Sequence, residues 1–418
     1  MKKYGCIGER LGHSFSKEVH NALADYNYEL IEIPKSELEG FATSKDFTAI
    51  NVTIPYKEQI IPYLYKIDAH AKSIGAVNTV VNRDGKLYGY NTDFYGMEML
   101  LLHAGIELSD KKVAILGSGG TAKTAFAVAT AKKAKTILRV SRSKKENVIT
   151  YDELYSYHGD VEIIINTTPV GMFPDISSSP IDISRFPRLT GVIDAVYNPL
   201  STELIRSAKE RGISAEGGLY MLVAQAVRAS EIFLDKKYTE EEMNRVFNKI
   251  YTQKQNIVLI GMPACGKSTV GKILSQKLSR DFFDSDTLIE EKCQKKISDI
   301  FSESGEKSFR DAESEVVAEL SARCGAVIAT GGGAILRKSN VSNLSKNGKI
   351  YFIDRPLNKL IPTDDRPLSK NYDDIKKRYE ERYDIYRNSA DVIISADASP
   401  ELVAEQIIGD FLNENIRN

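Results

Sequence analysis

Two glycine-rich turns constrain the fold of this chain more than any other feature. They are GSGGTA at 117–122 and GMPACGKS at 261–268, and each follows a short β-branched run and precedes an amphipathic helical pattern. A strand, a glycine turn and a helix in succession open a βαβ unit, in which the strands are parallel. Other short apolar runs alternate with helical patterns along most of the chain. The sequence therefore predicts an α/β fold built on parallel sheets.

The length of the chain predicts more than one domain, because 418 residues exceed the size of a single compact core. A polar stretch at 235–256 separates the last apolar helix pattern of a first half from the strand that starts a new sheet, so we place a boundary near residue 253. We expect three parts: a substrate lobe at 1–105, completed by about 219–250, a Rossmann-like domain at 106–218, and a P-loop domain at 254–418.

Composition argues against several classes of partner. The formal net charge is −1, so no bulk attraction to nucleic acid or to an anionic membrane is expected. No apolar run approaches the roughly 18 residues that cross a bilayer, and no signal-peptide pattern is visible. Four scattered cysteines indicate neither a disulfide framework nor a zinc site. We expect a cytoplasmic protein with small-molecule partners, and its oligomeric state stays open.

The first turn has the G-x-G-x-x-A pattern of a dinucleotide site. Gly117 permits the tight turn, Gly119 lets the backbone approach a pyrophosphate, and Ala122 allows close packing of the next helix. The following strand ends in Ser141 and Arg142, where an NAD site usually has an acidic residue. Because an arginine can meet a 2′-phosphate, the pattern favours NADP. The alternative is a structural turn followed by a solvated basic loop.

The first lobe carries polar side chains that suit a small hydroxylated substrate. Lys57 and Asp93, if they meet in a cleft, can act as proton donor and orienting carboxylate. Hydroxyl and amide groups can hold a polyhydroxylated ring, and the candidates are Ser14, Ser16, Thr53 and Asn78. By spacing alone, each of these side chains is more readily explained as a surface or capping residue.

The second turn matches the phosphate-binding pattern G-x-x-x-x-G-K-S. Its backbone amides can cradle phosphates, Lys267 can reach the outer phosphates, and the Ser268 hydroxyl can bind magnesium. The pattern predicts a nucleoside triphosphate site, and the alternative is a chance match in a helix cap.

Charged residues downstream of this turn suggest the second substrate. DSD at 284–286 is expected to place two carboxylates on one face of an extended segment, one for a magnesium shell and one for a substrate hydroxyl. Several arginines and a run of glycines favour an anionic small substrate. The arginines are Arg310, Arg366 and Arg382, and the glycines are residues 331–333. Taken one by one, these features are also explained as helix caps, solvated surface residues or a loop.

Residues 1 to about 250 resemble shikimate dehydrogenase. The resemblance rests on NVTIPYK, GAVNTVV, GYNTDFYG, GSGGTAK, NTTPVGM, DAVYNPLSTELI and GGLYMLVAQA, in this order. It implies reduction of 3-dehydroshikimate by NADPH, with Lys57 as the catalytic proton donor and Asp93 holding it. The implied substrate contacts are Ser14, Ser16, Thr53, Asn78, Asp93, Tyr197 and Gln225. The implied NADP contacts are Gly117, Ser118, Gly119, Gly120, Thr121, Ala122, Lys123, Ser141, Arg142, Ala195 and Gly218.

Two stretches depart from the pattern of that family. The opening GERLGHSFSK lacks both prolines of the usual glycine, proline and HSxSP arrangement, although its two serines remain. The usual N-R-T of the 2′-phosphate stretch is Ser141-Arg142-Ser143 here.

Nearly all of 254–418 resembles shikimate kinase, which implies a P-loop kinase domain of the nucleoside monophosphate kinase type. The resemblance rests on the P-loop, DSD, GEKSFR, TGGG and RPL, in this order. It implies ATP contacts at Pro263, Ala264, Cys265, Gly266, Lys267, Ser268, Thr269 and Arg366, with Ser268 and Asp284 around Mg²⁺. The implied shikimate contacts are Asp286, Arg310, Gly332 and Arg382, with Asp286 and Lys267 in catalytic roles. The lid around KLIPTDDRPL is shorter than in many members of the family.

Two alternatives remain at this point. One is a dehydrogenase that prefers quinate or NAD, against which the two serines of HSFS and Arg142 argue. The other is a non-catalytic sensor that binds shikimate-like ligands and nucleotide, which should have lost the catalytic groups that this chain retains.

Overall fold

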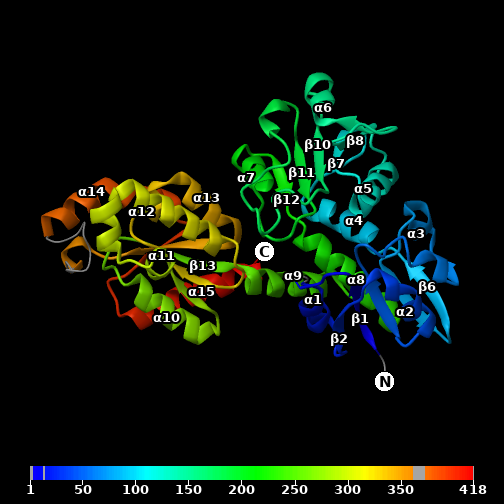
Figure 1. Cartoon of the computed structure of the whole chain (residues 1–418), viewed down its shortest axis with the longest axis horizontal. Coiled ribbons are helices and arrows are strands. Elements are labelled where there is room, and N and C mark those ends of the chain that lie inside the picture. Colours follow the sequence, from blue (N-terminus) through cyan, green and yellow to red (C-terminus); the bar gives the residue numbers. More distant parts are fainter. Residues whose placement is uncertain (1–2, 13–14, 361–371, 418) are drawn as a thin grey trace. The chain divides into compact units, whose positions relative to one another are not determined.

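The computed structural model describes residues 3–12, 15–360 and 372–417. The chain divides into two compact units, Met1–Ile250 and Tyr251–Asn418, and each is described by itself (Figure 1). Ser14 and Arg366, two of the expected site residues, lie outside the described residues.

The N-terminal unit begins with a mixed six-stranded sheet. Its strands are β1 Tyr4–Gly8, β2 Tyr28–Glu32, β3 Ala49–Val52, β4 Lys66–Ile67, β5 Thr79–Arg83 and β6 Lys86–Tyr90, in the order β2-β1-β3-β5-β6-β4. The helices of this lobe are α1 Ser16–Leu23, α2 Leu38–Ser44 and α3 Ala69–Ile74, with the short turns η1 Lys35–Glu37 and η2 Ile61–Tyr63. β5 and β6 form an antiparallel hairpin, which departs from the expected parallel alternation. Asp84 and Gly85 adopt φ values of 53° and 77°, as a two-residue hairpin turn requires.

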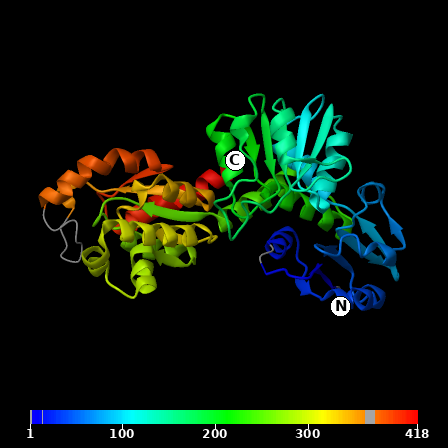
Figure 2. The same ribbon diagram turned by 45° about the horizontal axis from the view of Figure 1, so that its top comes forward.

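A second six-stranded sheet follows, and all its strands are parallel. The strands are β7 Lys112–Leu116, β8 Thr136–Ser141, β9 Ile149–Thr150, β10 Ile163–Asn166, β11 Gly191–Asp194 and β12 Ser214–Glu216, in the order β12-β11-β10-β7-β8-β9. Its helices are α5 Gly120–Ala131, α6 Tyr151–Tyr157 and α7 Glu203–Glu210, with η3 Ile183–Arg185. Figure 2 shows the first lobe in blue and this second lobe in cyan to green.

Two further helices complete the N-terminal unit, α4 Asp93–His103 and α8 Leu219–Leu234, and the chain leaves the unit through α9 Glu240–Lys254, which spans the division after Ile250. α4 packs along α8, and these two helices also contact α5 and α1, so they join the two lobes. The polar stretch at 235–256, in which we expected the domain boundary, is mostly α9. It packs because Met243, Val246 and Ile250 recur at helical spacing and are buried.

The C-terminal unit is a five-stranded parallel sheet between helices. The strands are β13 Asn256–Ile260, β14 Phe282–Asp284, β15 Val327–Ala329, β16 Gly348–Asp354 and β17 Val392–Ser395, in the order β14-β15-β13-β16-β17. The helices are α10 Lys267–Leu278, α11 Ser285–Cys293, α12 Ile297–Ser321, α13 Lys338–Asn347, α14 Tyr372–Ser389 and α15 Pro400–Arg417, with η4 Ala334–Leu336 and η5 Leu357–Lys359. α10 and α15 cover one face of the sheet, and α12 and α13 cover the other (Figure 1).

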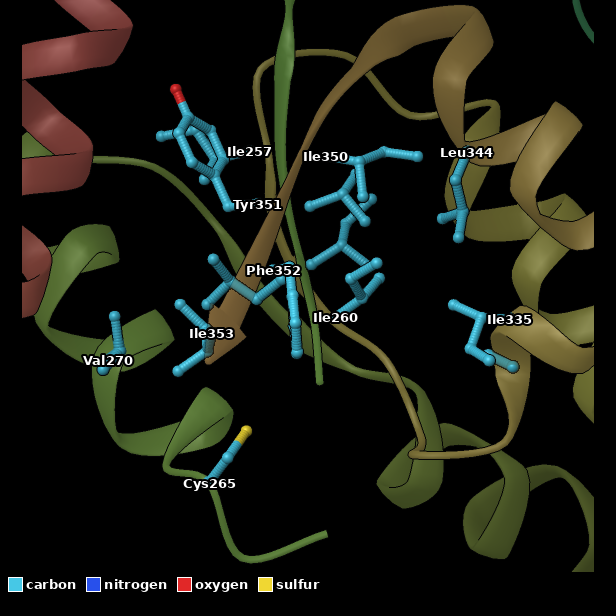
Figure 3. Packing of buried hydrophobic residues seen from close by; sticks show 14 of the residues in the cluster. Ile257, Ile260, Cys265, Val270, Ile335, Leu344, Ile350, Tyr351, Phe352 and Ile353 are labelled. Carbon is cyan, nitrogen blue, oxygen red and sulfur yellow. The ribbon is translucent and has the colours of Figure 1, made fainter. Parts of the chain in front are cut away.

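The core of the C-terminal unit forms where its two central strands meet these helices. β13 and β16 are buried along almost their whole length, as near-continuous apolar runs in a parallel sheet should be. Figure 3 shows their side chains packing toward Val270 of α10 and Leu344 of α13. Because β13 is buried between helices, the turn that follows it is held in a fixed position.

Candidate functional sites

The N-terminal unit contains a cavity of about 450 Å³. It brings together many of the residues expected to form the first site, namely Ser16, Thr53, Lys57, Asn78, Asp93, Thr121, Ala195, Tyr197, Gly218 and Gln225. These residues come from both lobes and from α8, so no single segment of the sequence forms the site. Residues that were not expected also line it, among them Cys6, Arg10, Asn51 and Met172.

Lys57 and Asp93 form an ion pair in this cavity. Lys57 Nζ lies 2.5 Å from Asp93 Oδ2, and both side chains are mostly buried. Lys57 follows the turn after β3, where its carbonyl accepts a hydrogen bond of 2.8 Å from Val77 N. Asp93 is the first residue of α4, where the positive end of the helix favours a carboxylate. The pair places a proton donor beside the space that a substrate would fill.

A hydrogen-bonded network fixes the amides around this pair. Asn78 Oδ1 accepts from Thr92 N at 2.7 Å, and Thr92 Oγ1 lies 3.4 Å from Gln225 Oε1. Asn51 accepts from the buried hydroxyl of Tyr28 at 2.7 Å and donates to Thr79 Oγ1 at 3.1 Å. Asn51 could have been found from the sequence, because it lies two residues before Thr53 and therefore on the same side of an extended strand.

The glycine turn stands at the edge of the cavity. Gly117 has a φ of 117°, which favours glycine, and α5 starts at Gly120. A Cβ built on Gly120 would lie 4.0 Å from Lys57 Cδ, so the turn adjoins the ion pair. Lys123 Nζ, an expected cofactor contact, pairs with Glu58 Oε1 at 2.7 Å.

The segment expected to meet the 2′-phosphate lies at the end of β8. Ser141 Oγ donates to the carbonyl of Ser143 at 2.5 Å, and the Arg142 side chain is exposed. Neither residue lines the cavity. An exposed guanidinium beyond the strand end can reach a ribose phosphate.

Asp194, at the end of β11, organises the loop that carries Ala195 and Tyr197. Its carboxylate accepts from Val196 N at 3.0 Å, Asn166 Nδ2 at 2.9 Å and Thr202 Oγ1 at 2.6 Å. Burial raises the pKa of Asp194 to about 6 despite these donors. Burial also raises the pKa of Tyr197, so its phenol stays neutral in the cavity.

In the C-terminal unit, the turn after β13 wraps around the Lys267 ammonium. Lys267 is buried, and its Nζ donates to the carbonyls of Gly261 at 2.8 Å and Met262 at 3.0 Å. Gly266 has a φ of 101°, which suits glycine, and α10 begins at the next residue. The turn thus presents backbone amides at a helix N-terminus, an anion-binding arrangement. Cys265 is buried beneath it.

Ser268 and Asp284 lie side by side, whereas Asp284 and Asp286 do not share an extended segment as expected. Ser268 Oγ donates to Asp284 Oδ2 at 2.6 Å. Asp284 ends β14 and caps α11 by accepting from Asp286 N at 3.0 Å, so Asp286 is already in the helix. The expectation failed because the first carboxylate provides the cap that starts a helix.

The other expected residues gather at the glycine run after β15. A Cβ built on Gly331 would lie 2.3 Å from Asp286 Oδ1, and one on Gly333 would lie 2.1 Å from Arg310 Nη1. The carbonyl of Gly332 accepts from Arg382 Nη1 at 3.3 Å. The run also adjoins the phosphate loop, because a Cβ on Gly332 would lie 2.9 Å from Pro263.

Two residues of this cluster were not expected, Glu313 and Tyr386. Arg310 Nη1 donates to Glu313 Oε2 at 2.8 Å, and the Tyr386 hydroxyl donates a hydrogen bond to the carbonyl of Gly332. Burial raises the pKa of Glu313, although Arg310 opposes the shift. Glu313 lies three residues after Arg310 on a helix, and this i, i+3 spacing is the sequence signal that could have identified the pair.

The described residues contain neither a cluster that could hold a metal ion nor a membrane-spanning helix. Among the side chains described in 3–12, 15–360 and 372–413, no group of three or more His, Cys, Asp or Glu residues could hold a metal ion. No helix of the part of the chain that the structure describes is long and apolar enough to span a membrane.

Comparisons with known proteins agree with this geometry. Residues 6–80 match the family model of the shikimate dehydrogenase substrate binding domain, and residues 263–412 match that of shikimate kinase. The shikimate dehydrogenase (NADP(+)) of Clostridium perfringens SM101 is 37% identical over 60% of this chain and 98% of its own length. The relatives of this kind align with the N-terminal unit, and the kinase match rests on the family model.

Solved structures show the same likeness. Shikimate dehydrogenase 1 from Peptoclostridium difficile aligns with a TM-score of 0.55 and 34% identity, over 60% of this chain and 98% of its own. Shikimate 5-dehydrogenase from Thermus thermophilus, solved with NADP(H) and shikimate, aligns with a TM-score of 0.54 and 28% identity over 60% and 99%. These results confirm the predicted α/β fold class and both resemblances. The chain belongs to the shikimate dehydrogenase family through its N-terminal unit and carries a shikimate kinase domain in its C-terminal unit.

Proposed function

We propose that the chain catalyses two consecutive reactions on one small ring. The N-terminal unit reduces 3-dehydroshikimate to shikimate with NADPH, and the C-terminal unit transfers a phosphoryl group from ATP to the 3-hydroxyl of shikimate. The observation that carries the proposal is the Lys57–Asp93 pair, 2.5 Å long, in a cavity that also contains Thr121 of the glycine turn.

In the first reaction, NADPH supplies the hydride when it is bound. The backbone of 117–123 with Ser141 and Arg142 would hold its phosphates, and Ala195 and Gly218 would flank it. Lys57 donates a proton to the oxygen of the ring ketone as that oxygen becomes an alkoxide. Asp93 orients the ammonium through their ion pair, and the hydroxyl and amide groups of the cavity hold the ring.

In the second reaction, the chain positions the two substrates side by side. Lys267 turns from its own carbonyls toward the outer phosphates of ATP, and Asp286 orients the 3-hydroxyl and accepts its proton. Arg310 and Arg382 hold the carboxylate of shikimate next to the glycine run. Ser268 and Asp284, which lie 2.6 Å apart, would bind Mg²⁺, since one carboxylate with substrate phosphates suits this ion. Arg366 is assigned to the phosphates by resemblance alone.

The test separates the two sites in the intact chain. NADPH oxidation with 3-dehydroshikimate and ADP release with shikimate are measured for the wild type, Lys57→Ala and Asp286→Asn. We expect each variant to lose one activity and keep the other, so each serves as the folding control of its partner. A chain that binds both ligands but turns over neither would contradict the proposal and favour a sensor.

A further inference from the structure

The cavity of the N-terminal unit has a cation that the mechanism above does not use. Arg10 lines this cavity, on the segment between β1 and α1. Among the side chains described in 3–12, 15–360 and 372–413, no acidic group forms an ion pair with it. An arginine at the wall of a polar cavity with its charge still available is suited to an anion.

The backbone around Arg10 is held in place. Leu11 N donates to Glu32 Oε1 at 2.6 Å, and the Leu11 side chain is buried in the core of the lobe. On the other side, a Cβ built on Gly8 would lie 2.8 Å from Thr53 Cγ2. Because both flanks of Arg10 are anchored, its backbone is held at the rim of the cavity, and its exposed side chain lines that rim.

The other charged groups of the cavity also favour binding of an anion by Arg10. Lys57 and Asp93 neutralise each other at 2.5 Å. Burial raises the pKa of Cys6 to about 12 and raises that of Tyr197 as well, so both side chains are neutral near pH 7. Among the described lining residues, Arg10 therefore leaves a net charge of about +1. A neutral polyol has no need of that charge, whereas a carboxylate does.

We propose that Arg10 binds the substrate carboxylate together with Ser16 and sets the preference of this cavity for acids over neutral rings. This inference rests on the proposed dehydrogenase function. Ser16, at the start of α1, lines the same cavity and supplies a hydroxyl donor. The phosphates of the cofactor are the other anions that could reach Arg10, and the test must separate the two.

The experiment uses the full chain and compares shikimate with its methyl ester in NADP⁺-dependent oxidation. We expect Arg10→Gln to raise the KM for shikimate roughly 10- to 100-fold, as loss of a charge-assisted contact should. The same variant should leave kcat, the KM for NADP⁺ and the kinetics of the ester nearly unchanged. Arg10→Lys should recover part of the loss. Lys17→Gln is the matched control, because it removes an exposed positive charge from the first turn of α1, close in sequence to Arg10 but outside the cavity.

Three results would overturn the assignment. They are an unchanged KM for shikimate, an equal loss for acid and ester, and a raised KM for NADP⁺, which would place Arg10 on the cofactor. Binding of shikimate to the same variants by calorimetry gives the comparison without turnover. A chain whose shikimate binding depends on Arg10 but which oxidises nothing would contradict the proposed function and support the role of Arg10.

Discussion

Lys57 and Asp93 lie 36 residues apart in sequence, yet their charged atoms meet at 2.5 Å. The lysine comes from the turn after β3 and the aspartate from the first turn of α4. The pair couples the position of the proton donor to the helix that packs on α8. We therefore expect the two residues to act as one unit in catalysis.

Removal of either Lys57 or Asp93 should lower kcat more than it raises KM. Lys57→Ala removes the proton donor, so kcat for the dehydrogenase reaction should fall by roughly 10²- to 10⁴-fold with a small change in KM. The kcat of Asp93→Asn should fall less. The kcat of the double variant should be only slightly lower than that of Lys57→Ala, because the effects of groups that work as a unit are not additive. Initial rates measure all three. Additive losses would show that the residues act separately.

Asp194 should make the stability of the N-terminal unit pH-dependent. The unfolded carboxyl loses its proton near pH 4 and the folded one at about 6, so between these values the unfolded state binds fewer protons. Stability should therefore fall as pH rises through this window, by about 3 kcal/mol from this group. Asp194→Asn should remove the slope.

Urea unfolding at several pH values, with hydrogen exchange of peptides from β10 and β11, measures this effect. Asp152→Asn is the control, since Asp152 is exposed on the surface of the same lobe. A slope that persists in Asp194→Asn would assign the pH dependence to other groups.

Arg310 and Glu313 should be coupled in stability. Their side chains are 10% and 1% exposed, so Arg310→Met leaves a buried carboxylate without its partner. We expect a loss of about 3–5 kcal/mol in the unfolding free energy of the C-terminal unit. The double variant Arg310→Met with Glu313→Leu should recover much of it. Denaturant unfolding of the four proteins forms a double-mutant cycle, and a coupling energy near zero would refute the buried pair.

Gly333→Ala should impair shikimate binding without unfolding the kinase domain. The new Cβ would lie 2.1 Å from Arg310 Nη1, the end of a long side chain, so the guanidinium must shift away from Glu313 while the backbone keeps its place. The KM for shikimate should rise while the KM for ATP stays the same. Gly409→Ala, where the added Cβ meets nothing within 4 Å, is the matched control. Equal changes for both substrates would indicate a general distortion.

Local patterns predicted much of the fold. The two glycine turns do lie between a strand and a helix, because a phosphate-binding turn has a strict backbone requirement that the sequence must meet locally. The β5–β6 hairpin was missed although Asp84-Gly85 is a turn signal. The segment at 235–256 was used only to place a domain boundary, because its polar residues obscured the apolar stripe by which α9 packs.

The candidate sites were less accessible to sequence reasoning. Lys57 and Asp93 were candidates by residue type, and the resemblance gave them their roles, because nothing in their spacing shows that β3 and α4 bring them together. Arg10 and Glu313 were missed because charge on a loop or helix usually faces solvent, and only the packed structure shows a cavity or a buried partner. Side-chain proximity across elements is a tertiary property.

The most direct test of the account is a single-tube assay of the wild-type chain with 3-dehydroshikimate, NADPH, ATP and magnesium. NADPH loss is followed by absorbance and shikimate 3-phosphate by mass spectrometry. We expect one shikimate 3-phosphate for each NADPH oxidised, with shikimate as a transient. NADPH consumption with accumulating shikimate would contradict the kinase assignment, and no NADPH consumption would contradict the central claim.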